Sequence, residues 1–172
     1  MEQNIFEECR ELLVQYNLTM ACVESATAGE LTATFSLTQQ SGDFLKGGLI
    51  CYDACIKEDL LKVDPALLKE FTPESTEVTY EITKGLSHLI EADIHIGITG
   101  LTRPGGSETI EKPVGTMFFC GLFGENKIFE DRKVFEGSQE EIVRQATVHT
   151  AYLLKKSLIK SNLLNNERNT KI

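Results

Sequence analysis

The sequence predicts an α/β protein, a three-layer α/β/α sandwich on a mixed sheet of about five strands with an antiparallel hairpin at one edge. Helical patterns alternate with short apolar strands through the first three strands, as they do where helices connect parallel strands. Two more strands then follow each other across a short turn. That second pattern is typical of an antiparallel hairpin.

The first helix is predicted over residues 5–16, "IFEECRELLVQY", because apolar residues recur at spacings of three and four. The apolar strand "LTMACV" follows. Thr27 and Glu30 then have the T-x-x-E spacing of a capping box, so a helix is predicted to begin at Ala28. Ser25 therefore lies on a turn between a strand and a helix.

A second strand is predicted at 44–52, "FLKGGLICY". Asp64 and Pro65 are cap and first-turn residues of a short helix, "VDPALLKEF". A longer helix is predicted within 72–92, with Thr72 and Pro73 as its start signals. Its apolar face is formed by Val78, Ile82, Leu86 and Leu89.

The third strand, "DIHIGITG", runs into a long loop at 101–115, "LTRPGGSETIEKPVG". Loops of this length in compact domains usually serve a function. The strands "TMFFCGLF" and "IFEDRKVF" are joined by the turn "GENK". Ser138 and Glu141 repeat the capping-box spacing before the last helix.

One domain is expected at residues 1–160, followed by a frayed tail at 161–172. The 172 residues are 41% apolar and carry a net charge of −9. That charge argues against nucleic acid as a partner, but a focused basic pocket for a small anion remains open. No segment has the targeting pattern of a leader or the roughly 18 apolar residues of a membrane span, so we expect a cytoplasmic protein without a membrane partner.

The five cysteines are scattered, odd in number and without a CxxC pair. We expect them to be reduced and buried as small apolar side chains. Cys51 and Cys55 lie four residues apart, but no histidine spacing accompanies them, so no metal site is expected.

Polar residues stand at the carboxyl ends of the first three strands: Glu24 and Ser25, Tyr52, and Thr99 with Gly100. If these strands are parallel, the residues meet on one rim, where sheets of this class bind ligands. Free backbone N–H groups at the turn after Ser25, in Thr27, Ala28 and Gly29, would favour an anion or a developing oxyanion there. A plain helix cap is the alternative explanation of that turn.

Ser25 is a candidate nucleophile if a base lies beside it. The sequence has three histidines, His88, His95 and His149. All three are predicted to lie away from the rim, in surface or packing positions. Lys57 follows the end of the second strand and is a better candidate for the base than the histidines, provided that the pocket is enclosed. The alternative is that Lys57 is an ordinary surface lysine. The segment "RPGGSE" matches no dinucleotide or nucleoside-triphosphate fingerprint, and its glycines form either an amide nest for a phosphate or a tight turn.

Five ordered motifs between residues 4 and 160 resemble the CinA C-terminal domain family. The segment "ESATAG" is similar to the family's E-S-C-T-G-G, and "GGLICYDACIK" to G-G-x-x-x-Y-x-x-x-x-K. "VDPALL" follows, "TGLTRPGG" is similar to T-G-x-A-G-P-G-G, and "EKPVGT" to K-P-V-G-T. Together the motifs are far more specific than any one alone.

The resemblance implies a homodimer or larger homo-oligomer that uses no cofactor and no metal. It also implies hydrolysis of the carboxamide of nicotinamide mononucleotide, to nicotinic acid mononucleotide and ammonia, in pyridine-nucleotide salvage. By position, Ser25 matches the attacking serine and Lys57 the lysine that assists proton transfer. The expected ligand contacts, from the resemblance and the rim together, are Glu24, Thr27, Gly29, Tyr52, Thr99, Gly100, Arg103, Gly105 and Gly106.

The chain departs from the family pattern around the same site. Alanines replace a cysteine and a glycine at Ala26 and Ala28, which strains the turn if position 28 has positive φ. Two arginines expected in the last helix are replaced by Gln139 and Val143. Arg103 on the glycine loop is a hypothetical substitute that could bind the same phosphate. A non-catalytic nucleotide-binding or regulatory paralogue, or a hydrolase of a different amide, is therefore the alternative.

Overall fold

The computed structural model describes residues 2–160, in which five strands form one mixed sheet in the order β2–β1–β3–β4–β5. β1 pairs in parallel with β2 and with β3, whereas β3–β4 and β4–β5 are antiparallel. The predicted mixed sheet and its antiparallel edge are confirmed. The strands are β1 Met20–Glu24, β2 Leu45–Ile50, β3 Ile94–Gly100, β4 Thr116–Phe123 and β5 Asn126–Val134.

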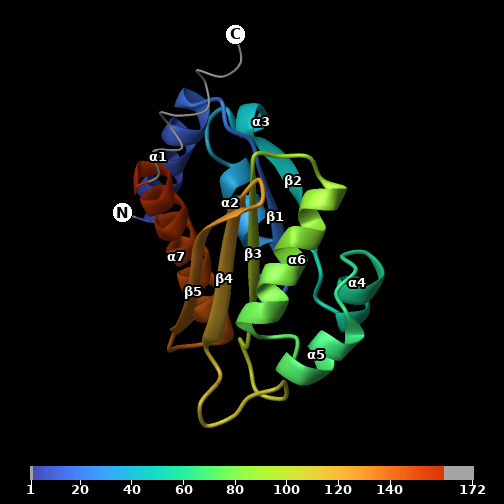
Figure 1. Ribbon diagram of the computed structural model, residues 1–172. Helices are drawn as coiled ribbons and strands as arrows, with labels where there is room; N and C mark the ends of the chain where they lie inside the picture. Colours follow the sequence, from blue (N-terminus) through green and yellow to red (C-terminus); the bar gives the residue numbers. More distant parts are fainter. Residues whose placement is uncertain (1, 161–172) are drawn as a thin grey trace.

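Helices cover both faces of the sheet, which gives the three layers (Figure 1). One face carries α1 Glu2–Gln15, α2 Glu30–Ser36 and α7 Gln139–Lys160. The other carries α6 Thr76–Leu89, with α4 Ala54–Asp59 and α5 Pro65–Phe71 beside it. The short α3 Ser41–Phe44 leads into β2. No helix in residues 2–160 combines the length and apolar character that crossing a bilayer requires.

The strand β1 shows how one apolar segment serves two cores. Met20 and Cys22 belong to the core under α1, α2 and α7, while Ala21 and Val23 belong to the core under α6. Successive side chains of a strand point to opposite faces, so a strand between two helical layers buries both of its faces and is apolar from Met20 to Val23. All five residues of β1 are buried.

Several predicted helix boundaries are wrong, each for a local reason. The helix α6 begins after Ser75, whose hydroxyl caps the Val78 N–H at 3.2 Å, so the start signals at 72 and 73 lie before it. Leu89, expected on its buried face, is about half exposed. The short helices α3 and α4 were not predicted, because four to six residues are too few for a periodic pattern.

Other cap predictions are confirmed. Asp64 caps α5 by accepting the Ala66 N–H at 2.8 Å. Ser138 and Glu141 form the reciprocal bonds of a capping box at the start of α7. The predicted frayed tail at 161–172 lies outside the described residues.

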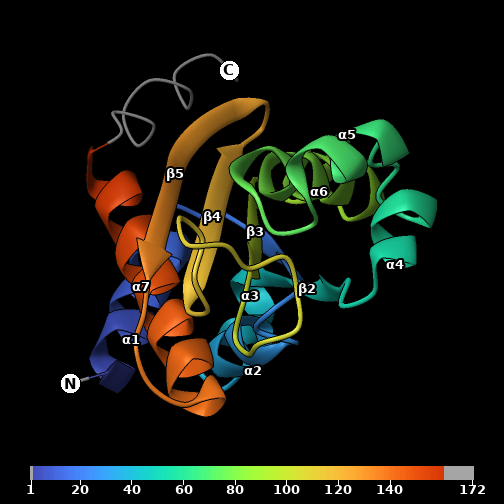
Figure 2. The ribbon, with the colours of Figure 1, turned by 90° about the horizontal axis from the view of Figure 1, so that it is seen from below.

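The three parallel strands end at one edge of the sheet, as the argument about the rim requires. The loop 101–115 begins at this edge, because it leaves the end of β3 (Figure 1). Viewed from below, it crosses the near end of the sheet between α2 and α5 (Figure 2). The predicted rim and the long loop thus lie together.

Candidate active site

The central feature of the rim is a contact between Ser25 and Lys57. The Lys57 Nζ lies 3.2 Å from the Ser25 Oγ, although the residues are 32 positions apart in sequence. Both are buried, with exposed fractions of 7% for Ser25 and 1% for Lys57. The structure therefore brings together the predicted nucleophile and the predicted proton acceptor, and Lys57 is no surface lysine.

The position of Lys57 follows from how the chain leaves β2. The Asp53 carboxylate caps α4 by accepting the Cys55 N–H at 2.9 Å, and Lys57 lies one turn into that helix. Its Nζ also donates to the Cys51 carbonyl at 2.7 Å. Within the described part of the chain, no acidic side chain lies at ion-pair distance from this amine. Its two partners are the Ser25 hydroxyl and the Cys51 carbonyl, which hold the amine beside the serine.

The turn that carries Ser25 is held by the Glu24 carboxylate, which is 1% exposed. One oxygen accepts from the Thr27 hydroxyl at 2.7 Å and from the N–H groups of Gly29 and Leu31 at 3.1 and 3.0 Å. The other accepts from the Thr32 N–H and hydroxyl at 2.8 and 2.6 Å. A buried carboxylate with five donors is a rigid anchor for this turn.

This anchor explains why the predicted capping box is wrong. The Thr27 hydroxyl donates to Glu24 and caps no helix, so α2 begins at Glu30 with Gly29 at its N-cap and no side-chain cap. Ala28 adopts φ of 51°, the left-handed conformation that was anticipated as a source of strain. An alanine there costs about 1 to 2 kcal/mol relative to a right-handed conformation.

Two backbone N–H groups of the turn remain available beside the serine. The amides of Ala28 and Gly29 are used, by the Ser25 carbonyl and by Glu24. Those of Ala26 and Thr27 donate no hydrogen bond within residues 2–160. Paired free amides next to a nucleophile are the usual donors of an oxyanion hole.

Ser25 opens into a pocket of about 350 Å³, within the size range of small-molecule sites. Several predicted contacts lie on its wall: Tyr52, Gly100, Arg103, Gly105 and Gly106. Tyr52 is 53% exposed and lies at the mouth. The wall also contains residues that sequence reasoning did not select: Ala26, Glu74, Leu101, Thr102 and Pro104.

Other predicted contacts do not line this pocket. Glu24, Thr27 and Gly29 are joined to one another and support the turn from behind. Thr99 is fully buried and its hydroxyl bonds to the Thr79 hydroxyl of α6 at 2.7 Å. Alternate residues of a strand face opposite sides, so a position at the end of β3 did not by itself place this side chain on the rim.

The glycines of the long loop form a tight turn around Glu108. The N–H groups of Gly105 and Gly106 each donate to this carboxylate at 2.8 Å. These bonds, with that from Gly105 the largest cause, lower the pKa of Glu108 below its ordinary value. Of the two explanations for "RPGGSE", the tight turn is the one observed, and these two amides are not free to hold a phosphate.

The same loop is fastened to the connection between α5 and α6. The Lys112 Nζ donates to the Thr72 hydroxyl at 2.6 Å, the Glu74 carbonyl at 3.0 Å and the Ser107 hydroxyl at 2.7 Å. Burial lowers the pKa of Lys112, and the charge of Glu74 opposes that effect. Sequence reasoning gave no signal for the contacts with Thr72 and Glu74, because they join positions 40 and 38 residues apart.

Gln139 is one of the residues that depart from the family pattern, and the structure shows what it contacts. Gln139, in the position of an expected arginine, reaches the loop through a 3.3 Å bond from its amide to the Thr102 hydroxyl. Gln139 thus brings no charge to the pocket, whereas Arg103 is a cation on its wall. The hypothesis that Arg103 replaces the missing charge fits this arrangement.

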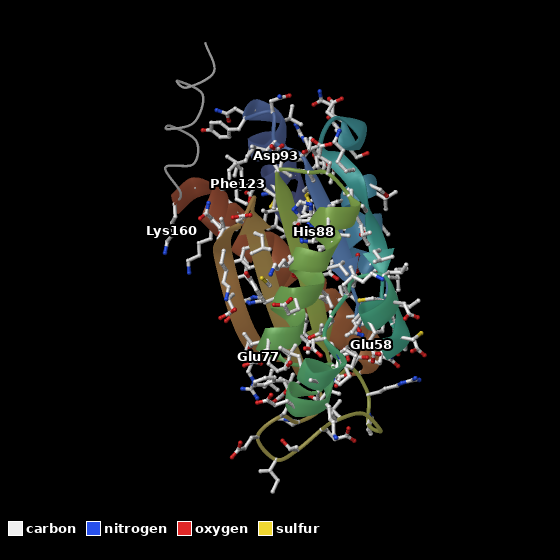
Figure 3. All side chains as sticks on the ribbon, turned by 45° about the vertical axis from the view of Figure 1, so that its right-hand side comes forward. Glu58, Glu77, His88, Asp93, Phe123 and Lys160 are labelled. Atoms are coloured by element: carbon white, nitrogen blue, oxygen red, sulfur yellow. The ribbon has the colours of Figure 1, made fainter. Side chains whose placement is uncertain are left out.

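The histidines lie away from the Ser25 pocket, as predicted. His88 lies on the outer side of α6, and Figure 3 marks it at the end of that helix opposite Glu77 and the long loop. His95 is buried and bonds to the Ile90 carbonyl, while His149 bonds to Asp131. Lys57 is therefore the base candidate nearest in geometry to Ser25.

All five cysteines are free, and Cys9, Cys22, Cys51 and Cys120 are buried as expected. Burial raises the pKa of their thiols, to about 12 for Cys9 and about 11 for Cys51 and Cys120. Cys55 is exposed, so the expectation of burial is wrong for this residue. Residues 2–160 contain no group of three or more potential metal ligands.

The sequence matches the family profile described as the CinA C-terminal domain over residues 2–158. CinA-like proteins of Leptospira interrogans (serovar copenhageni) and Mycobacterium marinum are 33% and 34% identical, over 88% and 81% of this chain. The chain spans about a third of these curated relatives, 36% and 32% of their lengths. A competence-damaged protein (CinA) superfamily structure from Klebsiella pneumoniae 700603 matches with TM-score 0.88 and 25% identity, covering 94% of this chain and 99% of that chain.

Proposed function

Because this chain belongs to the CinA C-terminal domain family, we propose that it hydrolyses the carboxamide of nicotinamide mononucleotide to nicotinic acid mononucleotide and ammonia. The observation that carries the proposal is the 3.2 Å contact between the Lys57 amine and the Ser25 hydroxyl on the wall of a ligand-sized pocket. Amide hydrolysis needs a nucleophile, a proton acceptor and donors for the oxyanion. Ser25 lines this pocket, Lys57 contacts Ser25, and the free N–H groups of Ala26 and Thr27 belong to the same turn.

In the first half of the reaction, the Ser25 Oγ attacks the carboxamide carbon and its proton passes to the neutral Lys57 amine. The carbonyl oxygen becomes an oxyanion, which the free N–H groups of Ala26 and Thr27 stabilise. Lys57 then gives the proton to the departing nitrogen, the C–N bond breaks and ammonia leaves. The product of this half is an ester between Ser25 and the nicotinate carbonyl.

In the second half, water attacks the ester carbon and gives a proton to Lys57. The C–O bond to Ser25 breaks, the serine oxygen takes that proton from Lys57, and the carboxylic acid product leaves and loses its acid proton to solvent. The 3.2 Å contact between the Lys57 Nζ and the Ser25 Oγ supports this role, because it puts the amine within reach of the proton in both halves of the reaction.

Arg103 supplies the charge for the phosphate of the mononucleotide in this proposal. It lies on the same pocket wall as Ser25, and a guanidinium suits the planar, paired oxygens of a phosphate. The amides of Gly105 and Gly106 are bonded to Glu108, so the phosphate depends on Arg103 rather than on a glycine nest.

Ammonia release from nicotinamide mononucleotide by the wild type and by Ser25→Ala tests the proposal. We expect turnover by the wild type and its loss in the variant. Turnover that survives the substitution refutes Ser25 as the nucleophile. Absence of turnover in both, with the mononucleotide still bound, favours the non-catalytic paralogue, and turnover of another carboxamide alone favours a different amide substrate.

A further inference from the structure

The pocket wall carries two charged side chains among the described residues, Arg103 and Glu74. Glu74 lies in the connection between α5 and α6, just before the Ser75 cap. A carboxylate on the wall of a site for an anionic ligand needs an explanation, because it repels a phosphate. Its hydrogen bonds provide one.

One oxygen of the Glu74 carboxylate is held by the protein, and the other is not. The Oε2 accepts from the Ser107 hydroxyl, and the Glu74 backbone carbonyl accepts from the Lys112 Nζ at 3.0 Å. The Oε1 has no hydrogen-bond partner within residues 2–160. The side chain is thus oriented by the loop while one acceptor remains unused.

The chemistry of the free oxygen selects its partner. An ionised carboxylate only accepts hydrogen bonds, so it binds hydroxyl groups and turns phosphate oxygens away. Nicotinamide mononucleotide has two sets of donors: the carboxamide N–H groups, which lie at Ser25 in the proposed reaction, and the two vicinal hydroxyls of the ribose, which are left for Glu74. Carboxylates bind ribose hydroxyls in the same way in dinucleotide sites of other folds.

We propose that Glu74 binds the ribose hydroxyls of the substrate and thereby fixes which end of the nucleotide faces Arg103. The inference rests on the proposed function and adds a specificity-determining residue to it. With Glu74 on the ribose and Arg103 on the phosphate, the base is left to lie at Ser25. Lys112 and Ser107 are positioning residues, since they act through Glu74 and the loop.

The test measures binding by titration calorimetry in the Ser25→Ala background, so that no turnover occurs. The ligands are nicotinamide mononucleotide and its 2′,3′-dideoxy analogue. With Glu74 present, we expect the mononucleotide to bind at least about tenfold more tightly than the dideoxy analogue, because hydrogen bonds to a charged group contribute that much. Glu74→Gln should weaken mononucleotide binding about tenfold, leave the analogue nearly unaffected and so remove most of the preference.

Ser107→Ala is the matched control, because it removes the protein partner of Glu74 and keeps the carboxylate. It should retain a clear preference for the ligand with the hydroxyls. The assignment is overturned if Glu74→Gln keeps the full preference for the mononucleotide over the dideoxy analogue. If the mononucleotide does not bind the background protein at all, the proposed function itself is overturned, and the Glu74 assignment with it.

Discussion

Glu24→Gln should destabilise the protein substantially, although it changes a single oxygen into an NH₂ group. In the best orientation, the remaining oxygen keeps the donors of Thr27, Gly29 and Leu31, and the NH₂ faces Thr32. The Thr32 hydroxyl can turn to accept, but the Thr32 N–H loses its acceptor, which costs about 1 to 3 kcal/mol. The retained bonds lose their charged acceptor and weaken further.

Together these effects should lower the free energy of unfolding by about 2 to 4 kcal/mol, measured by urea denaturation with the slope unchanged. Thr27→Val is the matched control, since it removes one of the five donors and nearly keeps the volume. It should cost about 1 kcal/mol. The argument is refuted if Glu24→Gln falls within about 0.5 kcal/mol of the wild type, or costs no more than Thr27→Val.

Three further predictions follow from single features. Ala28→Gly should raise the free energy of unfolding by about 0.5 to 1 kcal/mol, because relief of the left-handed alanine exceeds the entropy that glycine adds to the unfolded chain; a lower melting temperature would contradict this. Arg103→Ala should raise KM for nicotinamide mononucleotide about tenfold or more. It should change KM for nicotinamide riboside, which has no phosphate, less than about twofold. Unchanged binding of the mononucleotide would contradict a contact between Arg103 and the phosphate. A disulfide reagent at pH 8 should modify one thiol, Cys55, in the native protein and five after denaturation, since the other four thiols are buried away from the reagent; several fast-reacting native thiols would contradict the burial.

The features that sequence could predict are those that depend on local pattern. The alternation of strands and helices predicted that three parallel strands end at one rim. That prediction placed Ser25 and Tyr52 together, and both line one pocket in the structure. The caps at Asp64 and Ser138 needed only residue type and spacing. The position of Lys57 after the second strand made it a candidate base with a surface lysine as the alternative, and the family resemblance then paired it with Ser25.

The features that sequence could not predict depend on competition between distant groups. Thr27 and Glu30 have capping-box spacing, but the buried carboxylate of Glu24 takes the Thr27 hydroxyl first. Gly105 and Gly106 have the composition of an anion nest, yet Glu108 already occupies their amides. In each case a carboxylate of the chain itself satisfies donors that the pattern alone leaves open.

The most direct test of the account is a double-mutant cycle on kcat for ammonia release, with Ser25→Ala, Lys57→Met and both together. If the hydroxyl and the amine act as one unit, each single variant should lose about 1,000-fold or more, and the double variant should be no slower than the worse of the two. Losses that multiply in the double variant, or a single variant that keeps near-normal turnover, would contradict the proposal that Lys57 and Ser25 transfer one proton between them.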